Sequence, residues 1–357
     1  TMLGDETDNV FFGNGGDDFL SGGAGDDQLF GDAGEDGFVG GAGNDFIDGG
    51  DGDTDTEEDY NEIYYSQENG GGPIFADMES GQVIDTYGDM DTVADIDLVE
   101  GTALDDVFIG SETEHVRFRG LGGQDVFFAG AGFDTLDYRK DDQYGGLNAI
   151  FADLSADFVI DGFGDLDTII TDNGEIDRVR GSDFHDVLLA SNVSVRLEGR
   201  EGEDFIKGKA GNDELTEGRG LDYLNGGDGI DLFYRDLSDD FDDFAFTAVL
   251  NLAEGRFYAA DSPDLFDQLV NIEEAVVVGN FNVELTGDAG DNYLETGNGA
   301  DILDGGAGDD ELAGGDGDDT LNGGEGDDHL IGEDGNAPLT GEEGEEDQIG
   351  GAGDETH

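Results

Sequence analysis

A nine-residue period runs along most of this chain and limits the folds that it can adopt. Clear copies are residues 22–30 (GGAGDDQLF) and 305–313 (GGAGDDELA). The first six positions are rich in Gly and Asp, and Gly takes the positive φ angles that tight turns need. The last three positions turn one apolar residue inward, as a short strand does. A single repeat cannot bury that residue, so the period predicts a solenoid of stacked repeats.

Two repeats, or 18 residues, would make one coil with a turn on each side. Asp18 would then lie over Asp36, and Asp27 over Asp45, about 4.8 Å apart. Carboxylates at this distance repel one another unless a cation lies between them. Oxygen ligands without His or Cys suit calcium better than zinc, and magnesium resists full dehydration. We therefore predict Ca²⁺ as a cofactor at multiple sites; the alternative is that the Gly-Asp turns are solvated loops.

Composition supports bound cations over simple disorder. The chain of 357 residues has 92 acidic residues and only 13 Lys and Arg, a formal net charge of -79. Acidic, Gly-rich chains are often disordered, yet 36% of the residues are hydrophobic and 24 are Phe. The charge argues against nucleic acid and anionic membrane surfaces as partners. No run of 18 apolar residues occurs, so no membrane insertion is expected. The lack of Cys excludes disulfides and thiolate metal sites.

The repeat resembles the RTX, or haemolysin-type, calcium-binding nonapeptide family, with its pattern Gly-Gly-x-Gly-x-Asp-x-apolar-x. The resemblance implies an all-β fold, a parallel β-roll (a β-solenoid). It also implies that the sixth-position Asp gives each calcium a side-chain oxygen and that carbonyls of adjacent turns complete the site. Members are typically exported from Gram-negative bacteria by type I secretion with an uncleaved C-terminal signal. This implies a secreted, extracellular protein, with association to the cell surface as one option.

The predicted calcium ligands share the sixth position of a repeat. They are Asp18, Asp27, Asp36, Asp45, Asp106, Asp125, Asp134, Asp186, Asp204, Asp213, Asp222, Asp231, Asp301, Asp310, Asp319 and Asp328. In the degenerate repeat 110–118, His115 takes that position by counting. Beyond Asp328 the position holds Ala337, Glu346 and Glu355, so we expect weak or absent calcium sites there.

The repeats fall into four blocks joined by three related insertions that read as β-rich. We assign 4–57 to block 1, 58–100 to insertion 1, 101–137 to block 2, 138–180 to insertion 2, 181–234 to block 3, 235–278 to insertion 3, and 279–357 to block 4, degenerate after about 331. Insertions 1 and 2 share Ile-Phe-Ala-Asp at 74–77 and 150–153 and Gly-Asp-x-Asp-Thr at 88–92 and 164–168. They resemble an element of long RTX proteins. Each insertion either pairs its strands laterally or caps one roll while starting the next.

No catalytic pattern is present, so we expect no enzyme. The four His do not form His-Glu-x-x-His, and neither a Gly-x-Ser-x-Gly elbow nor a Gly-x-x-x-x-Gly-Lys-Ser/Thr loop occurs. The favoured function is a structural or adhesive calcium-binding part of a secreted or cell-surface protein. The alternative is the noncatalytic C-terminal region of a type I-secreted exoenzyme or toxin. Ice binding is less favoured, because Thr does not recur in the turns.

Calcium is the expected partner, and the adhesive interpretation adds other copies of the chain or a cell-surface glycan. The repeat begins almost at the first residue, no signal-peptide pattern precedes it, and the last residues lack a less-charged stretch. We therefore expect the sequence to be a piece of a longer protein. Folding is expected to be coupled to calcium binding outside the cell, at sites with dissociation constants on the order of 10⁻⁴–10⁻³ M.

Overall fold

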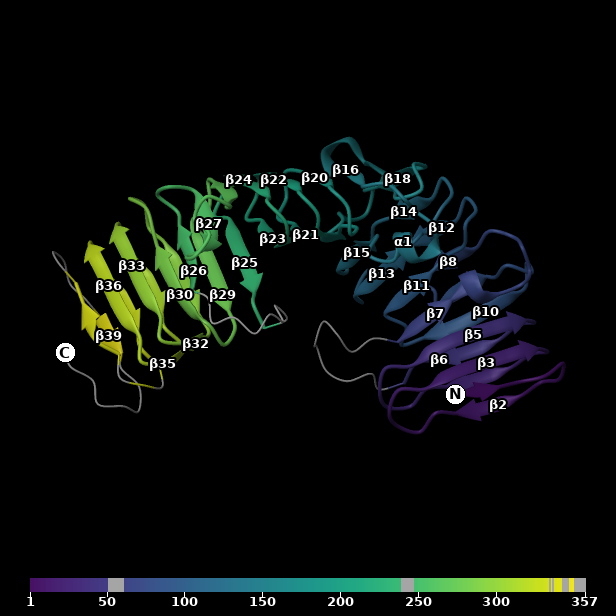
Figure 1. The fold of residues 1–357 in the computed structure, drawn as a ribbon. Helices are drawn as coiled ribbons and strands as arrows, with labels where there is room; N and C mark the ends of the chain where they lie inside the picture. Colours follow the sequence, from purple (N-terminus) through teal and green to yellow (C-terminus); the bar gives the residue numbers. More distant parts are fainter. Residues whose placement is uncertain (51–60, 239–246, 334, 336, 342–346, 350–357) are drawn as a thin grey trace. The chain divides into compact units, whose positions relative to one another are not determined.

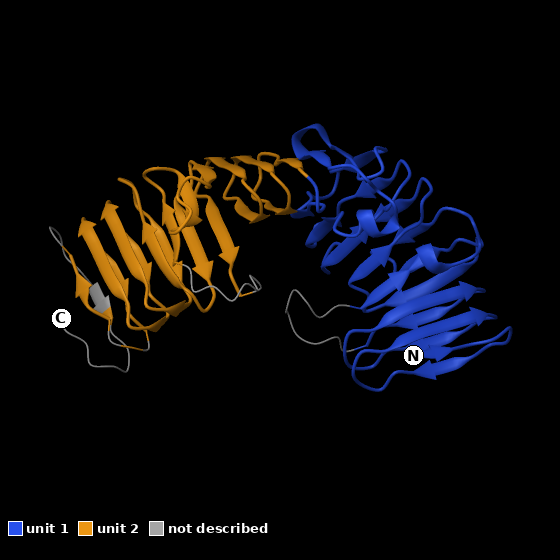
Figure 2. Cartoon of the chain, viewed as in Figure 1, with its two compact units in different colours: residues 1–184 blue, residues 185–357 orange. Residues whose placement is uncertain are grey.

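A computed structural model describes residues 1–357 except 51–60, 239–246, 334, 336, 342–346 and 350–357. The chain divides into two compact units, 1–184 and 185–357 (Figure 2). Nearly all regular structure is β, and the helical segments among the described residues are short: η1 (Tyr65–Gln67), α1 (Asp141–Tyr144) and η2 (Leu154–Ala156). In this described part, no helix has the length and apolar character needed to cross a membrane.

The nine-residue repeats stack as an 18-residue coil, as predicted. Strand β3 (Phe19–Ala24) pairs in parallel with β5 (Gly37–Ala42) and sets Leu20 opposite Phe38. On the other side of the coil, β4 (Gln28–Phe30) pairs in parallel with β6 (Phe46–Asp48) and sets Leu29 opposite Ile47. Partners in both pairs are 18 residues apart. Successive strands therefore alternate between two facing sheets, and the parallel β-roll is confirmed (Figure 1).

In unit 1, a first and a second sheet face each other. The first sheet has the order β1 (Met2–Leu3), β3, β5, β7 (Glu62–Tyr64), β11 (Leu98–Glu100), β13 (Val116–Arg119), β15 (Asp134–Asp137) and β19 (Arg178–Arg180). The second sheet has the order β2 (Val10–Phe12), β4, β6, β10 (Met90–Ala94), β9 (Gln82–Ile84), β8 (Phe75–Asp77), β12 (Val107–Ile109), β14 (Val126–Phe128), β18 (Leu166–Ile170), β17 (Phe158–Ile160) and β16 (Phe151–Asp153).

Unit 2 has the same two-sheet construction. Its first sheet has the order β21 (Arg196–Glu201), β23 (Glu214–Arg219), β25 (Leu232–Asp236), β29 (Glu274–Val278), β31 (Tyr293–Thr296), β34 (Glu311–Ala313), β37 (His329–Ile331) and β39 (Asp347–Ile349). Its second sheet has the order β20 (Val187–Leu189), β22 (Phe205–Ala210), β24 (Tyr223–Asp228), β28 (Asp267–Val270), β27 (Arg256–Ala259), β26 (Thr247–Asn251), β30 (Asn282–Thr286), β33 (Ile302–Ala307), β36 (Thr320–Glu325) and β38 (Leu339–Thr340). A short pair, β32 (Asn298–Gly299) with β35 (Asp316–Gly317), lies apart from both.

The core of the roll is a single file of apolar side chains from each sheet. The eighth position of the repeat supplies them, and Leu20, Leu29, Phe38 and Ile47 are all fully buried. Leu303, Leu312, Leu321 and Leu330 fill the same place in unit 2. Because the strands hold few inward-facing residues each, this core is narrow. The turns on its two sides therefore lie close to buried structure and contribute to the interior.

Each insertion adds an antiparallel meander of three strands to the second sheet. In insertion 1 the strands β8, β9 and β10 form this meander, and β10 pairs in parallel with the preceding β6. Strand β8 pairs in parallel with the following β12. In unit 2, β28 and β26 bracket the meander in the same way, against β24 and β30. The insertions therefore pair laterally and do not cap the roll.

One predicted register is wrong. Counting from Gly110 places His115 at the sixth position, but in the structure Val116 pairs with Asp134 and is buried there. His115 is exposed and packs against Phe133. The reason is an extra residue in this repeat, because Asp106 and Asp125 are neighbours at a separation of 19 residues. The boundary between block 1 and insertion 1, and the predictions for Glu346 and Glu355, lie outside the described residues.

The single-file core makes a specific prediction about stability. Replacing the fully buried Leu29 by Ala removes contacts that no neighbouring side chain can restore. We expect the calcium-loaded protein to lose about 2–5 kcal/mol of unfolding free energy in denaturant titrations. Val10→Ala is the control, because Val10 is 53% exposed on the same sheet, and it should change stability by about 0.5 kcal/mol or less. Equal effects of the two substitutions would contradict this core assignment.

Candidate metal centres

The turns on both sides of the roll carry stacked aspartates, each holding the backbone of the coil before it. Asp36 Oδ1 accepts the backbone N–H of Asp18, and Asp45 Oδ1 accepts that of Asp27, both at 2.8 Å. Twelve aspartates share this geometry, and we call them the aspartate ladder: Asp27, Asp36, Asp45, Asp125, Asp204, Asp213, Asp222, Asp231, Asp301, Asp310, Asp319 and Asp328.

The second carboxylate oxygen of every ladder residue is buried and has no hydrogen-bond donor. An unpaired buried acceptor costs about 1–3 kcal/mol, and more when it is charged. Native proteins rarely leave such atoms unpaired without an ion or water at the site. Twelve repetitions of the same unpaired Oδ2 therefore indicate a ligand that the turns are built to hold.

Glycine at the first position of the repeat leaves room for that ligand. A Cβ built on Gly22 would lie closer than 3.0 Å both to Asp27 Oδ2 and to the carbonyl oxygen of Gly40, one coil further on. A Cβ on Gly31 would meet Asp36 Oδ2 and the carbonyl oxygen of Gly49 in the same way. Each turn thus directs a carboxylate oxygen and a carbonyl oxygen at one small space that contains no side chain. These are the ligands of a hard cation, and they fit calcium.

Electrostatics in the turns also favours a bound cation. Burial raises the pKa of Asp125 to about 9, and the charge of Asp167 adds to the shift. Burial raises the pKa of Asp204 to about 8, and that of Asp213 to about 7. The neighbouring charged groups that raise these three pKa values are all aspartates. A divalent cation would restore the ionised form by direct attraction.

Three predicted ligands depart from the ladder geometry. Asp18 is half-buried, and its Oδ1 accepts the amino terminus at 3.0 Å. Both oxygens of Asp106 are hydrogen-bonded, in part to Thr102. Asp134 uses Oδ2 within its own turn and keeps a buried, unpaired Oδ1. The remaining predicted ligand, Asp186, is buried like the ladder residues, at 1% exposure.

The ladder continues into the insertions through five acids and one asparagine that the repeat pattern did not identify. On one side, Asp91 accepts the N–H of Asp45 (3.0 Å), Asp167 that of Asp125 (3.1 Å), and Asp267 that of Asp222 (2.8 Å). On the other side, Asn61, Asp177 and Glu273 accept from Asp36, Asp134 and Asp231. The shared Gly-Asp-x-Asp-Thr segments contain Asp91 and Asp167, so a comparison of the two insertions was the available signal.

One turn replaces the first-position glycine by a charged residue. Glu217 stands where Asp222 would face a glycine, and its side chain is buried. The Nε atom of Arg235 lies 3.7 Å from Glu217 Oε1. At this turn a cation from the chain itself therefore stands near the carboxylates.

In the first sheet of unit 1, a buried arginine likewise neutralises buried carboxylates. Arg119 is fully buried and contacts Glu100 at 2.8 Å and Asp137 at 3.0 Å, and it also pairs with Glu62. Burial by itself would raise the pKa of Asp137, but Arg139 and Arg119 hold it well below its usual value. The contrast separates carboxylates that the chain neutralises itself from ladder carboxylates such as Asp204 and Asp213, whose neighbouring charges are acidic.

Comparison with known families agrees with this geometry. A family described as "RTX calcium-binding nonapeptide repeat (4 copies)" matches residues 3–38, 38–53, 115–137, 198–233, 284–312 and 304–336. Most of each insertion lies outside these segments. No match to a curated protein was found.

The glycine space can be tested by filling it. Gly31→Ala places a methyl group against Asp36 Oδ2 and the Gly49 carbonyl. We expect loss of metal at that turn and a fall in unfolding free energy of about 1–3 kcal/mol, measured by denaturant titration in calcium. Gly15→Ala is the matched control, because its Cβ would meet only Ala33 O, at 3.7 Å. If both variants behave alike, the first-position glycine is not part of a metal site.

The raised pKa values predict how the calcium-free protein responds to pH. Ladder pKa values of about 6 for Asp310 and about 9 for Asp125 exceed the usual 3.8, so protonation favours the folded state. This stabilisation is complete below the usual value and is lost as pH rises through about 6 to 9. In chelator, we expect the β signal in circular dichroism to grow as pH falls from 9 to 5. A signal independent of pH, with sedimentation excluding aggregation, would contradict the burial of these carboxylates.

Proposed function

Since this chain carries RTX calcium-binding nonapeptide repeats and belongs to that repeat family, we propose that it is a secreted or cell-surface structural protein that folds when it meets extracellular calcium. Calcium binding at multiple sites is the property of the repeats. Our proposal adds three points: the location outside the cell, the coupling of folding to calcium binding, and the structural role. The observation that carries them is the aspartate ladder, whose twelve buried Oδ2 atoms lack a donor.

Charge supports the coupling of folding to calcium. The sequence has a formal net charge of -79, and without cations this charge opposes any compact state. In addition, the roll requires the ladder carboxylates to be buried and close together. When metal binding supplies the compensation, its binding free energy becomes folding free energy. The chain would then stay extended where calcium is scarce and fold where calcium is abundant.

Calcium concentration supports a site of action outside the cell. Oxygen-ligand sites of extracellular modules have dissociation constants on the order of 10⁻⁴–10⁻³ M. Such sites stay empty at the low calcium concentrations inside cells and fill at the millimolar concentrations outside. An extended chain also suits passage through a secretion channel, which links the calcium requirement to export.

A noncatalytic, adhesive role is supported by how the acids and the outer surface are arranged. Each ladder aspartate accepts a backbone N–H group of the previous coil. This hydrogen bond gives the aspartates a structural role, and we do not assign them as catalytic acids or bases. On the outer face of the second sheet in unit 1, Phe12 stacks on Phe30 with ring centroids 4.9 Å apart, and Phe30 contacts Phe46 at 5.6 Å. Phe12 is 50% exposed. A row of aromatic rings of this kind suits contact with a glycan or with another copy of the chain.

Circular dichroism and small-angle scattering of the whole chain test the proposal. In excess chelator at pH 7.5 we expect an expanded chain with little β signal. Added calcium should give a compact β protein, with a midpoint on the order of 10⁻⁴–10⁻³ M. The same concentration of magnesium is the control and should give little change. An unchanged β signal in chelator would sink the coupling of folding to calcium.

A further inference from the structure

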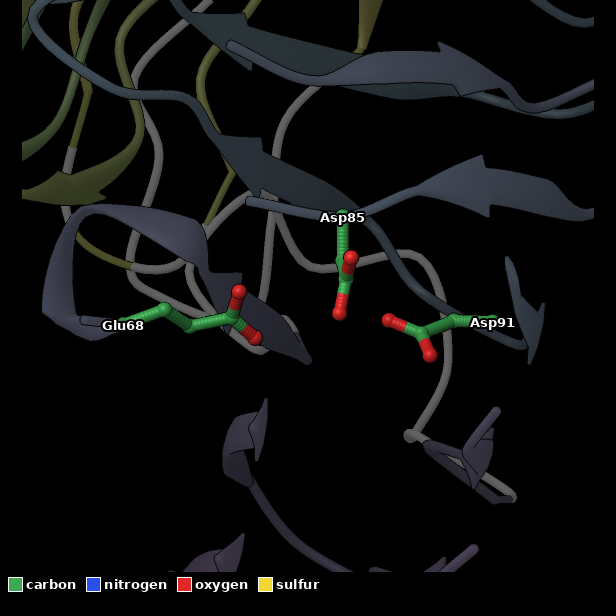
Figure 3. A group of neighbouring side chains, drawn as sticks. All are labelled: Glu68, Asp85 and Asp91. Atoms are coloured by element: carbon green, nitrogen blue, oxygen red, sulfur yellow. The ribbon is translucent and has the colours of Figure 1, made fainter. Parts of the chain in front are cut away.

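Insertion 1 brings three carboxylates together outside the repeats. Glu68 follows η1, Asp85 opens the turn between β9 and β10, and Asp91 lies in β10. One oxygen of each lies within 4.8 Å of the others (Figure 3). All three residues fall outside the segments that match the repeat family. The cluster therefore needs an explanation of its own.

Asp85 supplies an unpaired oxygen that points into this cluster. Its side chain is buried, with 1% exposure. Its Oδ1 accepts the backbone N–H groups of Tyr87 at 2.9 Å and Asp89 at 2.7 Å, whereas Oδ2 is buried without a donor. Figure 3 shows the Asp85 carboxylate directed into the space between Glu68 and Asp91. A buried carboxylate oxygen aimed at two other carboxylates is costly unless a cation or a proton joins them.

The other two acids are held in place by neighbours. Asp91 accepts the backbone N–H of Asp45 at 3.0 Å and the hydroxyl of Tyr65 at 3.3 Å. Glu68 accepts the backbone N–H of Gly41 at 3.1 Å and the hydroxyl of Thr86 at 2.7 Å. Outer partners of this kind orient metal ligands before the ion arrives. Each carboxylate oxygen keeps a lone pair for an ion.

The neighbouring charges that act most strongly on the three carboxylates are negative. The neighbours whose charges raise the pKa of Asp91, after burial itself, are Asp45, Asp85 and Glu68. Those acting on Glu68 and Asp85 in this way are also acidic. No cation of the chain is among these contributors.

Insertion 2 repeats part of this arrangement. Asp167 accepts the backbone N–H of Asp125 at 3.1 Å and the hydroxyl of Tyr138 at 3.2 Å. Asp161 Oδ1 accepts two backbone N–H groups of its turn, and its Oδ2 is buried and unpaired. Asp141 accepts the backbone N–H of Gly162 at 3.0 Å, and the positive charge of Arg119 acts on it. In the described part of the chain these three carboxylates do not bring their oxygens within 4.8 Å of one another, as those of insertion 1 do.

Insertion 3 provides the contrast. Glu217, Asp222 and Asp267 also gather there, but Arg235 Nε lies 3.7 Å from Glu217 Oε1. A charge of the chain itself is thus present at the third cluster. The cluster of insertion 1 has no such group among the charges that act on Asp91.

A cavity beside the first cluster gives an ion access and room for water. Tyr65, Glu68 and Thr86 line this cavity of about 260 Å³ together with the apolar side chains of Leu104 and Leu121. Calcium takes six to eight oxygen ligands. Waters in the cavity can therefore complete a coordination shell that begins with the carboxylates.

We propose that insertion 1 binds a calcium ion through Glu68, Asp85 and Asp91. Glu68 and Asp85 distinguish this site from those between the glycine-rich turns, whereas Asp91 also continues the ladder after Asp45. The ion ties the β-meander of insertion 1 to the neighbouring coil of the roll. The insertion is thereby a calcium-dependent part of the structure in its own right.

Native mass spectrometry of the full chain in calcium-containing buffer counts the bound ions and tests the proposal. We expect Asp85→Asn to hold one calcium fewer than the wild type. The Asn oxygen can still accept the Tyr87 and Asp89 N–H groups, so the loss of a hydrogen-bonding role alone would not change the count. Asp77→Asn is the control, because Asp77 lies in the same meander but outside the cluster, and it should keep the full count.

Circular dichroism in calcium establishes that each variant is folded. If Asp85→Asn does not fold, Glu68→Gln decides, since Gln can still accept from Gly41 and Thr86. An unchanged calcium count in folded Asp85→Asn, or in folded Glu68→Gln when it serves as the deciding variant, overturns the proposal. A wild-type chain that binds no calcium would instead contradict the calcium-binding function of the repeats, which distinguishes the two failures.

Discussion

The carboxylate oxygen that each ladder aspartate leaves buried and unpaired is the constraint on which the roll depends. One oxygen of the side chain holds the backbone of the previous coil, as Asp36 does for Asp18. The stacking of coils therefore requires the carboxylate to be buried, and burial leaves the second oxygen without water. The narrow core cannot offset many charges of this kind. The same interaction that sets the coils in register thus leaves in each turn a buried oxygen that a bound cation would satisfy.

The chain solves the problem of buried negative charge in two ways. At Arg119 it uses its own guanidinium, which contacts Glu100 and Asp137 inside the first sheet of unit 1. In the turns, the charges next to ladder residues such as Asp204 are acidic. An internal arginine neutralises its carboxylates permanently. A diffusible ion neutralises them only to the extent that its concentration fills the site. If folding is coupled to calcium as proposed, the distribution of the two solutions sets which parts of the roll respond to calcium.

The insertions continue the stacked, hydrogen-bonded carboxylates of the roll and do not interrupt them. Their meanders enter the second sheet, and Asp91 and Asp167 take the ladder positions after Asp45 and Asp125. The roll thus passes through each insertion with its hydrogen-bonded register intact. At the same time the hairpin turns add Asp85 and Asp161, which also bury an unpaired oxygen but lie outside the ladder positions. A segment that looks like a break in the sequence period is therefore a continuous part of the roll.

The sequence by itself determined the 18-residue coil, the buried apolar residue at the eighth position of the repeat, and calcium as the cation that the repeats bind. A strict period of nine residues with Gly and Asp at fixed positions allows few arrangements of the chain. As that period predicts, Leu29 is buried in the core and Asp27 lies in a turn. Only the tertiary structure decided the register of the repeat with the extra residue, where Val116 replaces His115. It alone joined Glu68, Asp85 and Asp91 as well, because these residues follow no period. Short-range spacing fixes residues that repeat, but clusters formed by a meander and a neighbouring coil depend on strand pairing between distant segments.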